Sequence, residues 1–213
     1  GLTRLSTLAV AHREVVRTPW GEPSSALLFG QVGGHDAVFL ARHGHGHTIP
    51  PHRVNYRANL WALKDRGATA VLAVASVGGI RGAPLGALVL PHQLIDYTHD
   101  RESTYFDGGD QRVVHVDFTH PYDPALRARC LTASHTAAIA LADGGVYGAV
   151  SGPRLETAAE IDVRPVAHQQ FGHVVGFTKR ARDIPVVDLP LVLLRVSGPH
   201  APAPIVGGPQ TSL

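Results

Sequence analysis

The sequence predicts a single α/β domain with a central β-sheet flanked by helices, and three observations predict it. The 213 residues suit one domain, because two full-size domains would be crowded into that length. At 44% hydrophobic residues, the chain can bury a sizeable core. Short apolar runs also alternate with helix-like segments, which is typical of a mostly parallel sheet with helices packed on it.

The N-terminal part of this pattern predicts a β-hairpin followed by a helix. Ser25–Gln31 and Asp36–Leu40 are apolar enough for two strands, and Gly33-Gly34 between them indicates a tight turn. Apolar residues on one face predict a helix over Asn55–Arg66, which Gly67 ends.

The rest of the chain continues the alternation. We expect strands at Ala70–Val77, Ala87–Pro91, Gly145–Val150, His173–Phe177 and Pro190–Val196, helices at Pro124–Ala142 and from Glu156 to Ile161, and a surface loop at Ser103–Gln111. We find no internal repeat and no linker, so residues 1–213 are expected to form one domain around a mixed sheet. Residues 197–213 are rich in Gly and Pro and are expected to be an irregular tail.

Charge and cysteine content argue against several classes of protein. The net charge of +2 comes from interspersed charges, so neither nucleic acid nor a membrane surface is an expected partner. The apolar runs are too short to span a bilayer, and the first residues lack the features of a signal peptide. The single cysteine, Cys130, rules out an internal disulfide and suits the cytoplasm, where we expect it to be a half-buried thiol.

The segment from Ala41 to His52 holds the densest set of chemical groups, directly after a predicted strand. Arg42 offers a fork of charged donors, and His43 and the glycine amides can add more, which favours an anion such as phosphate. A metal site at His43, His45 and His47 is the weaker alternative, because alternate residues of an extended chain share a face and no cysteine or carboxylate lies nearby. A merely structural loop remains open.

Three further segments place polar groups at strand ends. Ser76 precedes Gly78-Gly79, where free amides can hold phosphate, but many α/β proteins turn in this way. Glu156 can accept hydrogen bonds from a sugar or base, or can simply face the dipole of its own helix. Phe177 and Thr178 offer a stacking ring and a hydroxyl, although core packing is the commoner role of such a phenylalanine. Together the four segments indicate a composite pocket.

These same segments resemble methylthioadenosine phosphorylase and its methylthioinosine-cleaving relatives in the purine nucleoside phosphorylase family. The most specific stretch runs from Arg42-His43-Gly44 to Lys64. The resemblance continues through 92–98, 105–108, 120–123 and 152–157 and fades beyond Thr178. It implies a nucleoside phosphorylase-type fold and a homotrimer that cleaves the purine–ribose bond with inorganic phosphate. It implies no cofactor and no metal.

The resemblance also implies roles for individual residues. Phosphate would be held by Arg42, His43, Ser76 and Thr178, the nucleoside by Ala75, Gly78, Glu156 and Phe177, and a neighbouring subunit's 5′-pocket by His115 and Phe118. Ala75 stands where the family has a polar residue, so one donor is expected to be lost. Phe177 stands where the family usually has a methionine against the ribose.

The base side departs further from the family. Relatives follow their last core strand with an Asp or Asn that protonates or hydrogen-bonds purine N7, whereas Ser197-Gly198-Pro199-His200 follows here. No catalytic residue is therefore assigned, although His200 is a conceivable substitute. The expected function is phosphorolysis of a 5′-methylthio-purine nucleoside, with a slight preference for 6-oxopurines. The alternative is an altered homologue that binds a nucleoside or phosphate compound without phosphorolysis, or does other chemistry in the same pocket.

Overall fold

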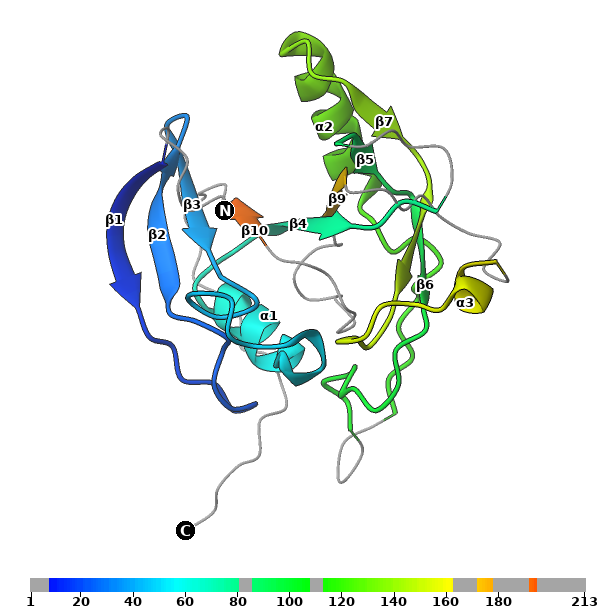
Figure 1. The fold of residues 1–213 in the computed structure, drawn as a ribbon. Helices are drawn as coiled ribbons and strands as arrows, with labels where there is room; N and C mark the ends of the chain where they lie inside the picture. Colours follow the sequence, from blue (N-terminus) through cyan, green and yellow to red (C-terminus); the bar gives the residue numbers. More distant parts are fainter. Residues whose placement is uncertain (1–7, 81–85, 108–112, 163–171, 178–191, 195–213) are drawn as a thin grey trace.

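The structure is a computed structural model that describes residues 8–80, 86–107, 113–162, 172–177 and 192–194 (Figure 1). Groups of two or three strands alternate with helices along these residues. In chain order the elements are β1 (Leu8–Glu14), β2 (Leu27–Val32), β3 (His35–Phe39), the 3-10 helix η2 (Pro51–Arg53), α1 (Tyr56–Asp65), β4 (Ala70–Val77), β5 (Leu88–Leu90), β6 (Gln93–Asp96), α2 (Pro124–Thr136), β7 (Leu141–Asp143), β8 (Val146–Ala149), α3 (Ala158–Asp162), β9 (Gly172–Phe177) and β10 (Val192–Leu194).

An antiparallel sheet of β1, β2 and β3 forms the N-terminal part. The turn between β2 and β3 is made by Gly33 and Gly34, whose φ angles of 56° and 79° lie in the left-handed region that glycine adopts without strain. The predicted hairpin is confirmed. β1 was not predicted, because exposed polar residues such as His12 and Arg13 interrupt its apolar pattern.

Helix α1 follows from local signals at both of its ends. The Asn55 side chain caps the N-terminus by accepting a hydrogen bond from the Ala58 amide at 3.0 Å. At the other end Gly67 has a φ of 78°, and its amide donates to the Lys64 carbonyl at 2.9 Å. The helix predicted over 55–66 is therefore confirmed.

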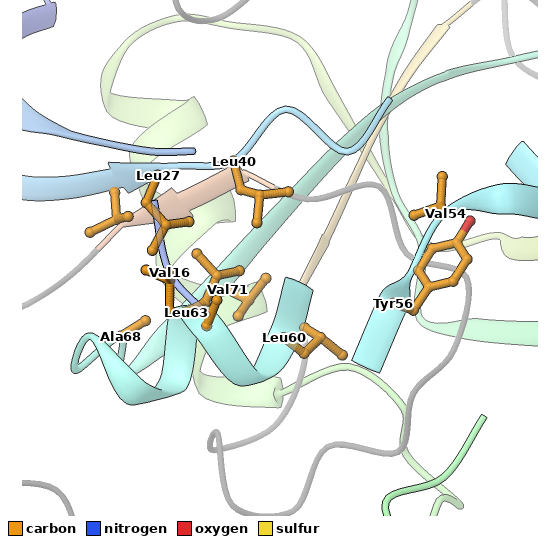
Figure 2. Packing of buried hydrophobic residues seen from close by; sticks show 11 residues of the cluster. Val16, Leu27, Leu40, Val54, Tyr56, Leu60, Leu63, Ala68 and Val71 are labelled. Carbon is orange, nitrogen blue, oxygen red and sulfur yellow. The ribbon is translucent and has the colours of Figure 1, made fainter. Parts of the chain in front are cut away.

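One core packs α1 against the N-terminal sheet and β4. Figure 2 shows Leu60 and Leu63 of α1 beside Val71 of β4, with Leu27 and Leu40 above them. Leu27 and Leu63 are almost fully buried, at 0% and 1% exposed. This core fixes the direction in which the chain leaves β3 and enters α1.

The central sheet has the strand order β10-β4-β9-β5-β7. β4 pairs antiparallel with both β10 and β9, whereas β5 pairs parallel with both β9 and β7. The expected mixed sheet is confirmed, but a mostly parallel one was wrong. In Figure 1, β4 runs from the N-terminal sheet to the half of the molecule that holds α2, where β6 and β8 form a separate parallel pair.

The helix predicted over Pro124–Ala142 ends early, at Thr136. Ala138 has a φ of 54°, which stops the helix, and Leu141–Asp143 then pairs with Leu88–Leu90 as β7. The segment Leu-Ala-Asp is too short to have a helical or strand preference of its own, so this long-range pairing decides its structure. In the described part of the chain, no helix has the length and apolar character needed to cross a membrane.

Candidate functional site

In the loop between β3 and α1, residues 41–51 fold back on themselves, and we call this segment the hook. The Gly44 amide donates to the Ala41 carbonyl and the Ile49 amide donates to the His43 carbonyl, both at 2.9 Å. Gly44 has a φ of 76°, and a Cβ added there would lie 3.1 Å from the Thr48 hydroxyl. Glycine is favoured here, because the left-handed backbone strains other residues and a Cβ would press on the Thr48 and Ile49 side chains.

The His43 ring is oriented by this hook. Its Nδ1 lies 2.8 Å from the Ile49 carbonyl oxygen. A carbonyl oxygen only accepts, so Nδ1 carries the proton of this hydrogen bond. In the neutral ring Nε2 is then a proton acceptor, suited to a hydroxyl of a protonated phosphate. In the charged ring Nε2 is a donor, suited to a phosphate oxygen.

The histidines of the loop do not gather into a metal site. The rings of His43 and His47 lie 4.4 Å apart, while His45 is exposed. Among the residues that the structure describes, no group of three or more His, Cys, Asp and Glu side chains is placed to hold one metal ion. Arg42 and His43, which the sequence predicts to bind an anion, are adjacent residues of this loop.

A second layer of hydrogen bonds supports the start of the loop. The Ala41 amide, next to Arg42, donates to the Ser25 hydroxyl at 3.0 Å. The neighbouring Ser24 amide donates to Asn59 Oδ1 at 2.7 Å, and Asn59 Nδ2 donates to Ser24 Oγ at 2.9 Å. Asn59 lies in α1 and is fully buried. The helix thus holds the backbone on which Arg42 stands.

An open pocket of about 480 Å³ lies beside this loop. Leu28 and Phe39 line it, on the face of the N-terminal sheet opposite Leu27 and Leu40, as the alternation along a strand requires. Its polar lining residues are Arg13, Ser25 and His45. An apolar-walled space with one permanent cation, the Arg13 guanidinium, therefore adjoins the hook.

The segment from Ser151 to Thr157 comes up against the same loop. A Cβ added to Gly152 would lie 3.3 Å from the Pro51 ring, so this ring packs closely on the Gly152 backbone. In Figure 1 the chain after β8 passes next to the chain that enters α1. The structure therefore brings together the segments that carry Arg42 and Glu156, two of the four in which site residues were predicted.

Glu156 stands on a rigidly capped turn. Glu160 accepts two hydrogen bonds from Arg154, at 2.7 and 2.8 Å, and one from the Thr157 amide at 2.8 Å. The Thr157 hydroxyl accepts from the Glu160 amide at 3.2 Å, completing a capping box. The hydrogen bonds from Arg154 and the Thr157 amide lower the pKa of Glu160 to about 2. Glu156 itself is half-buried.

The other two predicted segments lie apart from each other. In the antiparallel pairing of β4 with β9, Ser76 stands opposite His173, while Phe177 stands opposite Leu72. Ser76 and Phe177 are four residues out of register, or about 13 Å along the strands. Ser76 and Gly78 are exposed, whereas Ala75 is buried at 8% exposed and its methyl group offers no donor. Thr178, like His200, lies outside the described residues.

The residues expected to serve a neighbouring subunit lie on an irregular segment at the surface. His115 is exposed and Phe118 is half-buried. Val113, Val114 and Val116 beside them are 80%, 45% and 37% exposed. Contiguous exposed apolar side chains of this kind are typical of a contact surface.

Sequence analysis missed the residues that join the two halves of the site, Tyr56 and Arg101. Arg101 donates to the carbonyls of Val150 and Ser151 at 3.2 and 3.0 Å. Tyr56 donates through its hydroxyl to the Pro51 carbonyl at 3.4 Å. These hydrogen bonds are all accepted by backbone carbonyls, which every residue possesses, so no sequence pattern predicts them.

Comparison with known proteins identifies the family of this chain. The family model described as the phosphorylase superfamily matches residues 4–177. The chain belongs to the phosphorylase superfamily. It is 49% identical over 162 residues to a probable S-methyl-5′-thioinosine phosphorylase of Pseudomonas syringae pv. tomato, covering 76% of this chain and 66% of that protein. It is 42% identical over 183 residues to a probable 6-oxopurine nucleoside phosphorylase of Dictyoglomus turgidum, covering 85% of this chain and 67% of that protein.

The solved structures give the same family. A methylthioadenosine phosphorylase from an Antarctic soil metagenomic library superposes with a TM-score of 0.70 at 29% identity, covering 82% of this chain and 68% of that one. The nucleoside phosphorylase-type α/β fold expected from the sequence is confirmed. The chain spans just under two thirds of the length of the Pseudomonas relative.

Proposed function

We propose that this phosphorylase-superfamily protein catalyses phosphorolysis of a 5′-methylthio-purine nucleoside, releasing the free purine and 5-methylthioribose 1-phosphate. The observation that carries the proposal is the 49% identity over 162 residues to a probable S-methyl-5′-thioinosine phosphorylase. The meeting of the Arg42 loop with the Glu156 segment at Pro51 and Gly152 supports it, because a phosphate and a nucleoside must bind side by side.

In the proposed reaction, a phosphate oxygen forms a bond to the anomeric carbon while the bond from that carbon to the purine nitrogen breaks. The bonding electrons leave with the purine, which takes up a proton. Arg42 and His43 would hold the phosphate with only one of Ser76 and Thr178, because the pairing of β4 with β9 keeps Ser76 about 13 Å from Phe177, the residue before Thr178. Preorganised donors of this kind lower the barrier by positioning and electrostatics. Gly78, Ala75, Glu156 and Phe177 would contact the nucleoside. The reaction needs inorganic phosphate as co-substrate and no cofactor.

We further propose that the base is a 6-oxopurine and that the protein acts as a homotrimer. The names of the relatives from Pseudomonas and Dictyoglomus support the first point. The exposed valines around His115 support the second, since this segment would finish a neighbour's 5′-pocket. Light scattering that gives a monomer at micromolar concentration would exclude the trimer.

The decisive experiment compares methylthioinosine, methylthioadenosine and inosine, each with and without phosphate, by chromatography of the released base. We expect phosphate-dependent release, fastest from methylthioinosine. Arg42→Ala should lose turnover and phosphate affinity together. Arg53→Ala is the matched control, because Arg53 is exposed in η2 of the same loop and removes the same charge. No base release from any nucleoside would overturn the proposal.

Ala75 favours one alternative, a homologue that binds nucleoside or phosphate without phosphorolysis. Its buried methyl group stands where a donor is expected, and leaving-group catalysis, which typically contributes about 10²–10⁴-fold, has no assigned residue. Nucleoside binding by calorimetry together with absent turnover would favour this alternative.

A further inference from the structure

Arg101 occupies the junction between the two halves of the site. Its Nη2 donates to the carbonyl oxygens of Val150 and Ser151, at 3.2 and 3.0 Å. Its Nη1 donates to the Tyr56 hydroxyl at 3.4 Å, and the guanidinium carbon lies 5.1 Å from the centroid of the Tyr56 ring. One side chain therefore joins the end of β8 to the first residue of α1.

The contacts continue into a closed ring. The Tyr56 hydroxyl donates to the Pro51 carbonyl at 3.4 Å. The Pro51 ring in turn packs on Gly152, 3.3 Å from the position that a Cβ of Gly152 would take. Gly152 follows Ser151, which returns the ring to Arg101. Pro51 belongs to the hook that carries Arg42, and Gly152 belongs to the segment that carries Glu156.

The loop that carries Arg101 is itself anchored. Arg57, only 7% exposed, pairs with Glu102 and Asp107 of this loop and lies 4.5 Å over the Trp20 ring. The Tyr105 hydroxyl donates to the Arg57 carbonyl at 2.7 Å. Arg101 thus extends from a fixed base, which a side chain must do in order to fix something else.

We infer that Arg101 is a positioning residue that sets the distance between the phosphate hook and the nucleoside segment. This inference rests on the proposed function. Arg101 acts through Ser151 and Pro51 and needs no contact with a substrate. The planar fork of an arginine can serve two carbonyls and a hydroxyl at fixed angles, whereas a lysine ammonium is a point charge on a flexible stem.

The inference predicts that replacing Arg101 lowers the rate with the nucleoside much more than it weakens phosphate binding. The hook's own hydrogen bonds, from Gly44 to Ala41 and between His43 and Ile49, do not involve Arg101, so phosphate binding should survive. The nucleoside segment should shift, and a displacement of about 1 Å in a reacting pair can cost about 100-fold in rate. For Arg101→Ala we expect kcat/KM for the nucleoside to fall about 10- to 100-fold, with the KM for phosphate changed less than about 3-fold.

The test compares Arg101→Ala and Arg101→Lys with wild type and with Arg127→Ala. Arg127 is the matched control because it also donates to strand-end carbonyls, those of Leu90 and Pro91 at 2.8 and 3.0 Å, in a different part of the structure. Rates are normalised to the folded fraction. We expect Arg101→Lys to fold and to lose part of the rate, and millimolar methylguanidine to restore rate to Arg101→Ala but not to Arg127→Ala.

Equal behaviour of Arg101→Ala and Arg127→Ala would overturn the inference, as would an equal loss of phosphate and nucleoside affinity. Absence of turnover in wild type would instead overturn the proposed function. In that case calorimetric binding of methylthioinosine decides the role of Arg101. Binding weakened at least about 10-fold in Arg101→Ala supports the inference, and unchanged or absent binding refutes it.

Discussion

Replacing Asn59 with alanine tests how the hook that carries Arg42 is held in place. Asn59 is fully buried in α1 and makes two hydrogen bonds to Ser24, at 2.7 and 2.9 Å. Ser25, the next residue, accepts the hydrogen bond from Ala41 that precedes Arg42. Loss of the Asn59 amide therefore leaves Ser24 without its partners and loosens the backbone under Arg42.

The size of the effect follows from these contacts. Removing one partner of a buried hydrogen bond costs about 1–3 kcal/mol, and Ser24 is only half-buried, so each bond counts near the lower end. Two bonds give a loss of about 2–3 kcal/mol in the free energy of unfolding. For a chain of this length that corresponds to a fall in Tm of about 4–12 °C.

The assay is thermal and urea unfolding of Asn59→Ala, Ser24→Ala and the double variant. Ser24→Ala removes the hydroxyl but keeps the amide that Asn59 Oδ1 accepts from, so about half of the loss is expected. The double variant should lose less than the sum, because both changes remove one shared bond. Lys64→Ala on the same helix is the control and should stay within about 0.5 kcal/mol of wild type. If Asn59→Ala unfolds like Lys64→Ala, the hydrogen bonds between Asn59 and Ser24 do not stabilise the fold, and the reasoning is refuted.

Three further predictions concern the site and the sheet. His43→Asn keeps an N–H near the Nδ1 position, so it should unfold like wild type but bind phosphate weakly. His43→Gln should lose about 1 kcal/mol in the free energy of unfolding but bind phosphate more tightly than His43→Asn. Phosphate-dependent Tm shifts measure both properties, and identical behaviour of the two variants would contradict the assigned orientation of the ring. Because folding lowers the pKa of Glu160 from 4.5 to about 2, the stability that this carboxylate contributes is present above pH 4.5 and lost as the pH falls toward 2. The difference in Tm between wild type and Glu160→Gln should therefore close between pH 4.5 and 2. A difference that stays constant down to about pH 2 would contradict this prediction. With Cys130 replaced by alanine, Ser76→Cys should form a disulfide with His173→Cys but not with Phe177→Cys, as judged by thiol titration; the reverse result would show another register between β4 and β9.

Local signals account for what the sequence predicted of the fold. Asn55 and Gly67 mark both ends of α1, and the unbroken apolar run of β4 coincides with Ala70–Val77. The sequence did not predict strand β7, because its three residues form a strand only through pairing with β5, some fifty positions earlier in the chain. The antiparallel pairing of β4 with β9 likewise depends on contacts about 100 residues apart, which periodicity does not carry.

In the candidate site, too, some residues were predicted from a local sequence pattern and others were missed. Arg42 and Glu156 were predicted as site residues because charged side chains after predicted strands have a sequence pattern. Arg101 and Tyr56 escaped because they act on carbonyls of Val150, Ser151 and Pro51, and a carbonyl acceptor has no residue type. Side chains that touch a ligand are therefore easier to predict than those that hold the backbone around it.

This division bears on what an assay of this protein measures. Charge-assisted hydrogen bonds from Arg42 and His43 would hold phosphate whether or not the base side is complete, since each contributes about 1.5–3 kcal/mol in the ground state. A group that protonates the purine contributes only as charge develops on the departing base, so its loss lowers kcat and leaves the phosphate Kd nearly unchanged. The donor expected to be lost at Ala75 belongs to the sugar and phosphate side, whereas the expected acid that is missing belongs to the base side. Turnover of methylthioinosine, measured beside phosphate binding in the same preparation, therefore separates a phosphorylase from a homologue that only binds.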